Sequence, residues 1–126
     1  MALILHIEDN PSNRKVVQHI LRCTSHRLIE AVNGQEGLEM AAREVPDLIL
    51  LDIQLPKLSG YEVARRLKAD EKLKHIPIIA VTSYALSGDD HKAIEAGCDA
   101  YIAKPYKPLE ILEGLAKFLG KDRRER

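Results

Sequence analysis

The stretch Leu50-Leu51-Asp52-Ile53-Gln54-Leu55-Pro56 decides the fold of this chain. Residues 48–51 are all apolar, without alternation, which is typical of a strand that is buried on both faces. This strand ends at Asp52, and the chain then turns through Leu55-Pro56 towards Ser59-Gly60. A carboxylate at the end of a buried strand is unfavourable unless another group pairs with it. Other parts of the chain are therefore expected to supply partners for Asp52.

The composition indicates an ordinary globular domain of 126 residues. Lys+Arg and Asp+Glu both number 19, so no overall field favours nucleic acid or an anionic membrane. Cys23 and Cys98 fit no metal or redox spacing, which favours a reducing, cytoplasmic location. The five histidines show no helical two-ligand spacing for zinc. We expect neither a signal peptide nor a membrane span, because no apolar run approaches the roughly 20 residues that a bilayer requires.

Five short apolar runs alternate with five amphipathic segments. Strands are predicted over residues 3–7, 27–32, 47–52, 77–82 and 100–103. Helices are predicted to begin at Asn10-Pro11, at Asn33 with Glu36, at Ser59 with Glu62, at Ser87 with Asp90, and at Pro108, with Gly97 and Gly120 as ends. This alternation predicts an α/β fold: a doubly wound, five-stranded parallel sheet with helices on both faces. Residues 1–120 are expected to form the domain and residues 121–126 a polar tail.

Polar residues follow four of the five predicted strands. In an open parallel sheet, ligands bind beyond the carboxyl ends of the strands, near the switch in strand order. The second strand delivers nothing obviously chemical there, which fits the order 2-1-3-4-5 with that strand at the edge. The other four strands deliver Glu8, Asp9, Asp52, Thr82 with Ser83, and Lys104.

This constellation suits phosphoryl transfer. Crowded carboxylates repel one another, which invites either raised pKa values or a hard cation. Carboxylate oxygens, with a carbonyl of residue 53 or 54, suit Mg²⁺. Asp52 is then a plausible nucleophile towards phosphorus, since a carboxylate can form an acyl phosphate. Lys104 would neutralise one phosphoryl oxygen and Thr82 would donate a hydrogen bond to another.

The same residues resemble the receiver domain of bacterial response regulators, over residues 3 to about 119. The resemblance rests on Glu8-Asp9, Asp52, Thr82 and Lys104-Pro105. The sequence around Asp52 is also similar to that of free-standing regulators. It implies a flavodoxin-like fold and Mg²⁺-dependent transfer of a phosphoryl group to Asp52. The donor would be a phosphohistidine of a sensor histidine kinase or histidine phosphotransfer protein. The implied metal ligands are Asp9, Asp52, Glu8 through water, and the Gln54 carbonyl.

The resemblance also implies a way to transmit the signal. Thr82 would move towards the phosphoryl group, and Tyr101 would swing inward behind it. The surface of the fourth helix, fifth strand and fifth helix would then change its affinity for a downstream protein. The Lys104-Pro105 bond is expected to be cis. We expect a monomer or weak dimer that makes no direct contact with nucleic acid or membrane.

Two residues depart from the family pattern. His6 stands in a central strand where an aliphatic residue is usual, and we interpret it as a hydrogen-bonded core histidine rather than a ligand. Tyr84 is bulkier than the small residue often found two positions after Thr82. With Gln54 it is expected to shield the phosphoryl group from water and so to change the lifetime of the phosphorylated state.

Three alternative functions are weaker. A hydrolase of the aspartyl-phosphate kind usually carries a second Asp two residues after the nucleophile, and Gln54 occupies that position here. A flavin-binding module would need a phosphate loop after the first strand, where Glu8-Asp9 would repel a phosphate. A receiver that no longer takes phosphate is disfavoured because the acidic residues are all present.

Overall fold

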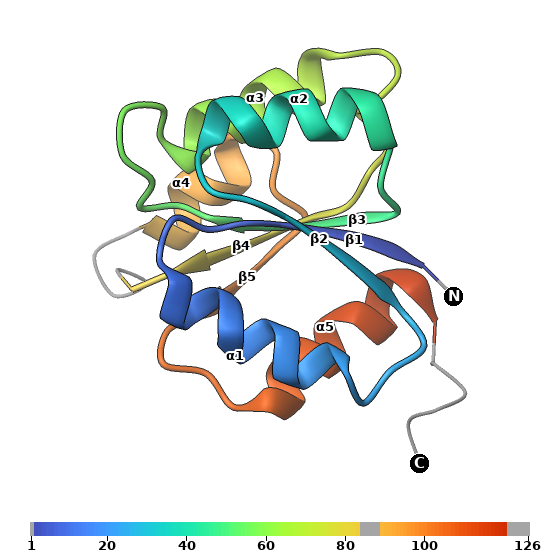
Figure 1. Cartoon of the computed structure of the whole chain (residues 1–126). Helices are drawn as coiled ribbons and strands as arrows, with labels where there is room; N and C mark the ends of the chain where they lie inside the picture. Colours follow the sequence, from blue (N-terminus) through green and yellow to red (C-terminus); the bar gives the residue numbers. More distant parts are fainter. Residues whose placement is uncertain (1, 84–88, 121–126) are drawn as a thin grey trace.

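The computed structural model describes residues 2–83 and 89–120, in which five strands alternate with five helices (Figure 1). The strands are β1 (Leu3–Ile7), β2 (Arg27–Ala31), β3 (Leu48–Asp52), β4 (Ile78–Thr82) and β5 (Ala100–Ala103). The helices are α1 (Pro11–Leu21), α2 (Gly34–Glu44), α3 (Gly60–Ala69), α4 (Asp89–Glu95) and α5 (Pro108–Leu119). The predicted strands at 27–32, 47–52 and 77–82 were each one residue too long. None of the helices in this described part is long and apolar enough to cross a membrane.

All five strands are parallel and form one sheet in the predicted order, β2-β1-β3-β4-β5. Every residue of β3 and β4 is buried, as expected for strands covered on both faces. β2 lies at the edge and is only partly buried. The register pairs Ile7 of β1 with Leu51 of β3, and Asp52 with Val81 of β4. The carboxyl ends of β1, β3 and β4 therefore lie side by side.

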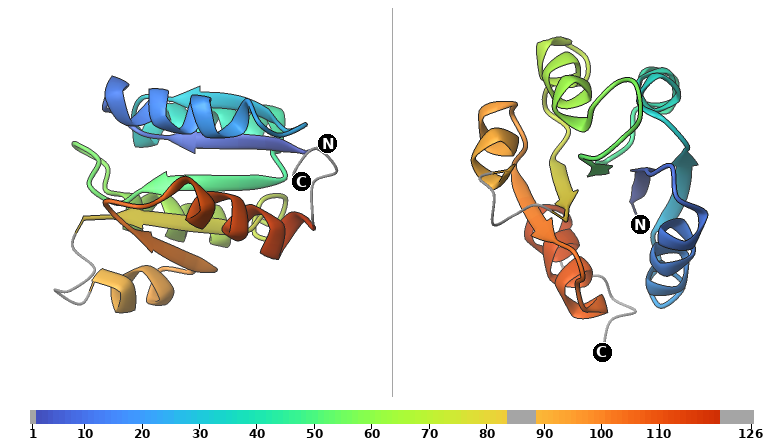
Figure 2. Two further views of the ribbon diagram at one scale, coloured as in Figure 1. Left: turned by 90° about the horizontal axis from the view of Figure 1, so that it is seen from below. Right: turned by 90° about the vertical axis from the view of Figure 1, so that its left-hand side faces the viewer.

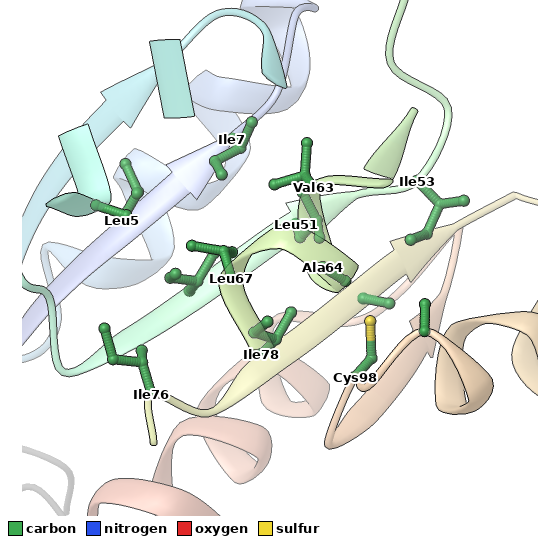
Figure 3. Packing of buried hydrophobic residues seen from close by; sticks show 14 of the residues in the cluster. Leu5, Ile7, Leu51, Ile53, Val63, Ala64, Leu67, Ile76, Ile78 and Cys98 are labelled. Carbon is green, nitrogen blue, oxygen red and sulfur yellow. The ribbon is translucent and has the colours of Figure 1, made fainter. Parts of the chain in front are cut away.

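Helices cover both faces of the sheet: α2, α3 and α4 lie on one side, and α1 and α5 on the other (Figures 1 and 2). Alternate residues of each strand point to opposite faces. One face carries Leu5, Ile7, Leu51 and Ile78, which pack with Val63 and Leu67 of α3 (Figure 3). The other carries Ile4, Leu50 and Ile79, which pack with Val17 and Ile111. Each buried Leu or Ile contributes about 1.5–3 kcal/mol, so both layers hold the sheet in place.

The helix caps follow the sequence pattern with two corrections. Asn10 caps α1 by accepting from the amides of Ser12 and Asn13, and Asn33 caps α2. The Glu36 carboxylate, predicted to accept from the amide of the cap, accepts instead from the Val32 amide at 3.1 Å. Ser59 accepts from the Glu62 amide, as predicted. The reciprocal bond expected from Glu62 is absent among the described contacts, because its carboxylate pairs with the guanidinium groups of Arg65 and Arg66. The predicted start of the fourth helix at Ser87 lies outside the described residues.

Gly60 allows α3 to begin directly against the end of β3. A Cβ at this position would lie 2.5 Å from the Asp52 carbonyl oxygen and 2.6 Å from the Ile53 Cα atom. The Gly60 amide also donates to the Ile53 carbonyl at 3.1 Å. Only glycine fits this close backbone approach. The residue thus fixes the loop that leaves Asp52.

Lys68 fastens the end of α3 to two neighbouring segments. Its Nζ atom donates to the carbonyls of Lys74 and Ile76 at 3.1 and 3.0 Å, and pairs with Asp99 Oδ2 at 3.0 Å. The same Asp99 oxygen accepts from the Ile78 amide at 2.8 Å. One ammonium group thereby joins α3, the start of β4 and the segment before β5, opposite the carboxyl ends of the strands.

We predict that Lys68→Met lowers the free energy of unfolding by about 1–3 kcal/mol, because it removes a partly buried ammonium group together with its three hydrogen bonds. Urea unfolding would measure the change. Lys74→Met is the matched control: it removes a lysine whose ion pair with Glu71 lies on the surface. That change is expected to stay within about 1 kcal/mol. Equal losses in the two variants would contradict a special role for Lys68.

His6 lies in the centre of the sheet, 2% exposed. The expected core position is confirmed, but the expected hydrogen bond is wrong for Nδ1, which has no partner. By alternation the imidazole shares the face of Ile4, where the buried side chains of α1 and α5 are aliphatic and offer no polar group. Burial, with the positive charges of Lys104 and Arg14, lowers the pKa of His6 to about 3. The ring is therefore neutral in the folded protein at ordinary pH.

This burial predicts an acid-sensitive stability. Between the ordinary pKa of 6.5 and the folded-state pKa of about 3, the unfolded chain binds a proton that the folded chain does not. The contribution of His6 to stability therefore falls as pH drops through this window, by up to about 1.4 kcal/mol per pH unit. We expect His6→Met to remove this slope in metal-free unfolding measurements. His19→Met, which removes an exposed imidazole from α1, should retain it; an unchanged slope in His6→Met would contradict the prediction.

Candidate functional site

The predicted site residues meet at the carboxyl edge of the sheet. Glu8 and Asp9 follow β1, Asp52 ends β3, Thr82 ends β4, and Lys104 follows β5. β1, β3, β4 and β5 are successive neighbours in the sheet, so four separate segments converge on one edge. The edge strand β2 contributes none of these groups, as its position predicts.

Three carboxylates form the centre of the site. One oxygen from each of Glu8, Asp9 and Asp52 lies within 4.8 Å of the others. Glu8 and Asp52 are buried, whereas Asp9 is exposed. Burial raises the pKa of Glu8, and the charge of Asp52 and a hydrogen bond with it raise it further, whereas Lys104 acts in the opposite direction. The cluster thus carries more negative charge than its surroundings neutralise.

Lys104 partly compensates this charge. Its Nζ atom lies 3.2 Å from Glu8 Oε1 and 3.6 Å from Asp52 Oδ1. Its backbone amide donates to the Thr82 carbonyl at 2.8 Å, which continues the pairing of β4 and β5 beyond the strand ends. The Lys104-Pro105 peptide bond is cis, as expected. The ammonium group is thus aimed back at the carboxylates from two strands away.

Backbone amides also orient the carboxylates. The Gln54 amide donates to Asp52 Oδ1 at 3.1 Å, and the Asn10 amide donates to Glu8 Oε2 at 3.2 Å. Sequence reasoning missed Arg14, whose Nη1 atom donates to the Glu8 carbonyl at 2.8 Å. The sequence signal that could have pointed to Arg14 was its position one turn into α1, since that turn begins beside the end of β1. These bonds fix the acidic side chains before any ligand arrives.

The side chain of Gln54 makes a contact that the sequence did not suggest. Its Nε2 atom donates to Thr82 Oγ1 at 2.8 Å, and its Oε1 atom accepts from the Ser83 amide at 3.2 Å. Thr82 is fully buried. The loop after Asp52 is therefore linked directly to the end of β4.

Tyr101 and Tyr84 were predicted to act around Thr82. Tyr101 in β5 is 41% exposed, so it is not the core residue that an aromatic strand residue usually is. Tyr84 lies outside the described residues.

The donor set fits a hard divalent cation. All three side chains offer carboxylate oxygens, the ligands that Mg²⁺ prefers. The pKa of Glu8 is raised by burial and then by the charge of Asp52, and a cation would offset this charge. Among the described residues, this cluster includes no cysteine or histidine. The arrangement can hold a cation next to a buried, oriented carboxylate and an ammonium group.

Comparison with known proteins agrees with this geometry. The family model described as the response regulator receiver domain matches residues 4–116. The chain belongs to this family. The receiver is 42% identical over 117 residues to the polar-differentiation response regulator DivK of Brucella anthropi, an alignment that covers 93% of this chain and 95% of DivK. The family resemblance suggested by the site residues is confirmed.

Two solved structures share the fold of this receiver. The receiver domain of the sensor histidine kinase PA1611 from Pseudomonas aeruginosa is 38% identical, with a TM-score of 0.89 and coverage of 95% of this chain and 98% of that one. That protein holds a magnesium ion in its active site cleft. The chemotaxis protein CheY4 of Vibrio cholerae is 26% identical, with a TM-score of 0.88 and coverage of 94% and 99%. The predicted flavodoxin-like class is confirmed.

We predict that Lys104→Met raises the affinity for Mg²⁺, because the ammonium group and a cation compete for the same carboxylate oxygens. The expected gain is about three- to tenfold, as for the removal of one nearby positive charge in a partly screened site. A Mg²⁺ titration followed through the amide signals of Asp9 and Gln54 would measure it. Lys107→Met removes an exposed lysine from the same loop and should change the affinity by less than about twofold. Unchanged or weaker binding in Lys104→Met would contradict the competition.

Proposed function

We propose that Asp52 is the residue of this receiver that accepts a phosphoryl group from a phosphohistidine. The observation that carries the proposal is that the buried Asp52 carboxylate belongs to an acidic cluster at the carboxyl edge of the sheet and lies 3.6 Å from the Lys104 ammonium group. A phosphoacceptor role in two-component signalling follows from the family. Asp52 suits the role because its Oδ1 atom is held by the Gln54 amide and its side chain is buried.

The proposed step is an in-line displacement. A carboxylate oxygen of Asp52 forms a bond to phosphorus while the bond between phosphorus and the donor imidazole nitrogen breaks, and the imidazole leaves with that electron pair. The product is an aspartyl phosphate. Lys104 would move from the carboxylates to a phosphoryl oxygen, and the Thr82 hydroxyl would donate to another. Such transfer depends mainly on positioning and charge stabilisation.

We propose that Asp9 and Asp52 bind Mg²⁺ directly, Glu8 through water, and Gln54 through its carbonyl. The magnesium ion in the related PA1611 receiver domain supports this assignment. When bound, Mg²⁺ would neutralise the carboxylates and the phosphoryl oxygens. Glu8 and Asp9 would then hold the cation without taking part in bond formation. Because the site itself supplies these groups, we propose that the receiver catalyses its own phosphorylation and dephosphorylation.

We propose that the signal passes from Thr82 to Tyr101 and then to the surface of α4, β5 and α5. The exposure of Tyr101 supports this route, since an exposed ring can change position without unpacking the core. The donors would be a sensor histidine kinase or a histidine phosphotransfer protein, and the recipient a downstream protein. A cavity of about 460 Å³ lies beside Lys104 and is lined also by Val16 and Tyr106.

The remaining assignments follow from the same proposal. Residues 1–120 would form the receiver domain, with residues 121–126 as a polar tail. The chain would act in the cytoplasm as a monomer or weak dimer, a location supported by its two free cysteines. It would contact neither nucleic acid nor membrane directly.

We expect Asp52→Asn to abolish phosphorylation. Phosphoramidate, whose phosphorus–nitrogen bond resembles that of phosphohistidine, can serve as donor, with mass spectrometry to detect one added phosphoryl group. The wild type should gain this mass only in the presence of Mg²⁺. Asp47→Asn is the matched control, because it makes the same change just before the opposite end of β3 and should leave the reaction intact. Phosphorylation retained in Asp52→Asn would remove Asp52 from its role.

A further inference from the structure

The side chain of Gln54 connects the loop after Asp52 with the end of β4, two parts of the site that have separate roles in the proposed reaction. Its backbone amide is tied to Asp52 Oδ1 at 3.1 Å, and its carboxamide makes two bonds to the end of β4. Nε2 donates to Thr82 Oγ1 at 2.8 Å, and Oε1 accepts from the Ser83 amide at 3.2 Å. Donor and acceptor of one amide are thus both used on adjacent residues.

These two bonds tie Thr82 and Ser83, at the end of β4, to the loop after Asp52. Asp52 pairs with Val81 in the register, so Thr82 and Ser83 lie just beyond the acceptor on the next strand. Thr82 is fully buried, and a hydrogen bond in such a place is stronger than one in water. The loop that carries Gln54 is itself held by Asp52 and by the close approach of Gly60. Thr82 cannot move towards Asp52 and keep both bonds unless Gln54 rearranges.

A phosphoryl group on Asp52 would compete with Gln54 for the Ser83 amide. It would bring three strong acceptor oxygens next to the end of β4. The Ser83 amide is a backbone donor that Gln54 Oε1 already occupies, whereas the Thr82 hydroxyl is the acceptor in its bond with Gln54 Nε2. An oxygen of the phosphoryl group that bound the Ser83 amide would displace the carboxamide oxygen, and with it the support that the carboxamide gives to Thr82. The resting and phosphorylated arrangements therefore exclude one another at the Ser83 amide.

We propose that the Gln54 side chain is a latch that stabilises the unphosphorylated arrangement of Thr82 and Ser83 and opposes the switch. It is a positioning residue that acts through Thr82, a role distinct from the metal ligation proposed for its backbone carbonyl. The inference rests on the proposed function, in which Asp52 takes the phosphoryl group. A conformational equilibrium moves only as far as the two states differ in free energy, so removal of the latch should favour the phosphorylated arrangement.

Gln54→Met tests the latch, because methionine keeps the length and bulk of the side chain but makes neither bond. Beryllofluoride, which mimics a phosphoryl group on a carboxylate, would be titrated at saturating Mg²⁺, so that any change in metal affinity does not affect the result. We expect Gln54→Met to bind it about five- to tenfold more tightly than the wild type, as for the loss of one or two hydrogen bonds from the resting state. Gln35→Met, which changes an exposed glutamine on α2, should bind as the wild type does.

A second measurement uses the protein without beryllofluoride. The Ser83 amide should exchange with solvent faster in Gln54→Met than in the wild type, since it loses its acceptor. Equal or weaker beryllofluoride binding by Gln54→Met, or an unchanged Ser83 amide, would overturn the latch while leaving the proposed function intact. Failure of the wild type to bind beryllofluoride would instead overturn the role of Asp52, and the latch with it.

Discussion

The ion pairs of Lys104 with two buried carboxylates constrain the whole site. Nζ lies 3.2 Å from Glu8 and 3.6 Å from Asp52, and both acids are almost fully buried. A buried charge without a partner destabilises a fold by several kcal/mol, so these three side chains must be brought together accurately. The parallel sheet does this, because β1 and β3 are neighbours and β5 ends two strands from β3. The pairing of the Lys104 amide with the Thr82 carbonyl then aims the lysine at the acids.

This compensation is incomplete, and the incompleteness suits a binding site. One ammonium group faces three carboxylates, and the pKa of Glu8 is raised first by burial and then by the charge of Asp52. A fully neutralised cluster would have little tendency to take up a cation or to release Lys104. Here a cation would relieve the repulsion and free the lysine for a phosphoryl oxygen in one event. In the proposed function, the residual negative charge would thus link metal binding to the transfer of a phosphoryl group to Asp52.

The sequence was sufficient for the fold and for the residues that gather at the site, but not for their contacts. Unbroken apolar runs predict β3 and β4, and polar residues at strand ends predict the positions of Asp52 and Lys104, because a parallel sheet brings those ends together. The contacts depend on rotamers and on local competition, which periodicity does not report. The carboxylate of Glu62 pairs with arginines instead of completing a cap, and His6 Nδ1 is buried without a hydrogen bond. Likewise, no pattern indicated the bonds from Gln54 to Thr82 and Ser83.

In the proposed function, those last bonds let a short loop couple Asp52 to a distant surface. Gly60 holds the loop after β3 in place, because its missing side chain lets the backbone pack against Asp52 and Ile53. The Ile53 amide also donates to the Val81 carbonyl at 3.1 Å, so the start of the loop is bound to β4 through the backbone. Beyond this point the loop reaches Thr82 and Ser83 through the side chain of Gln54, whose two bonds can break without disturbing the backbone pairing. From there Thr82 adjoins β5 through the Lys104 amide, and β5 carries the exposed Tyr101. A rigid loop that is joined to Thr82 and Ser83 by the side chain of one residue is thus a physical basis for a two-state response.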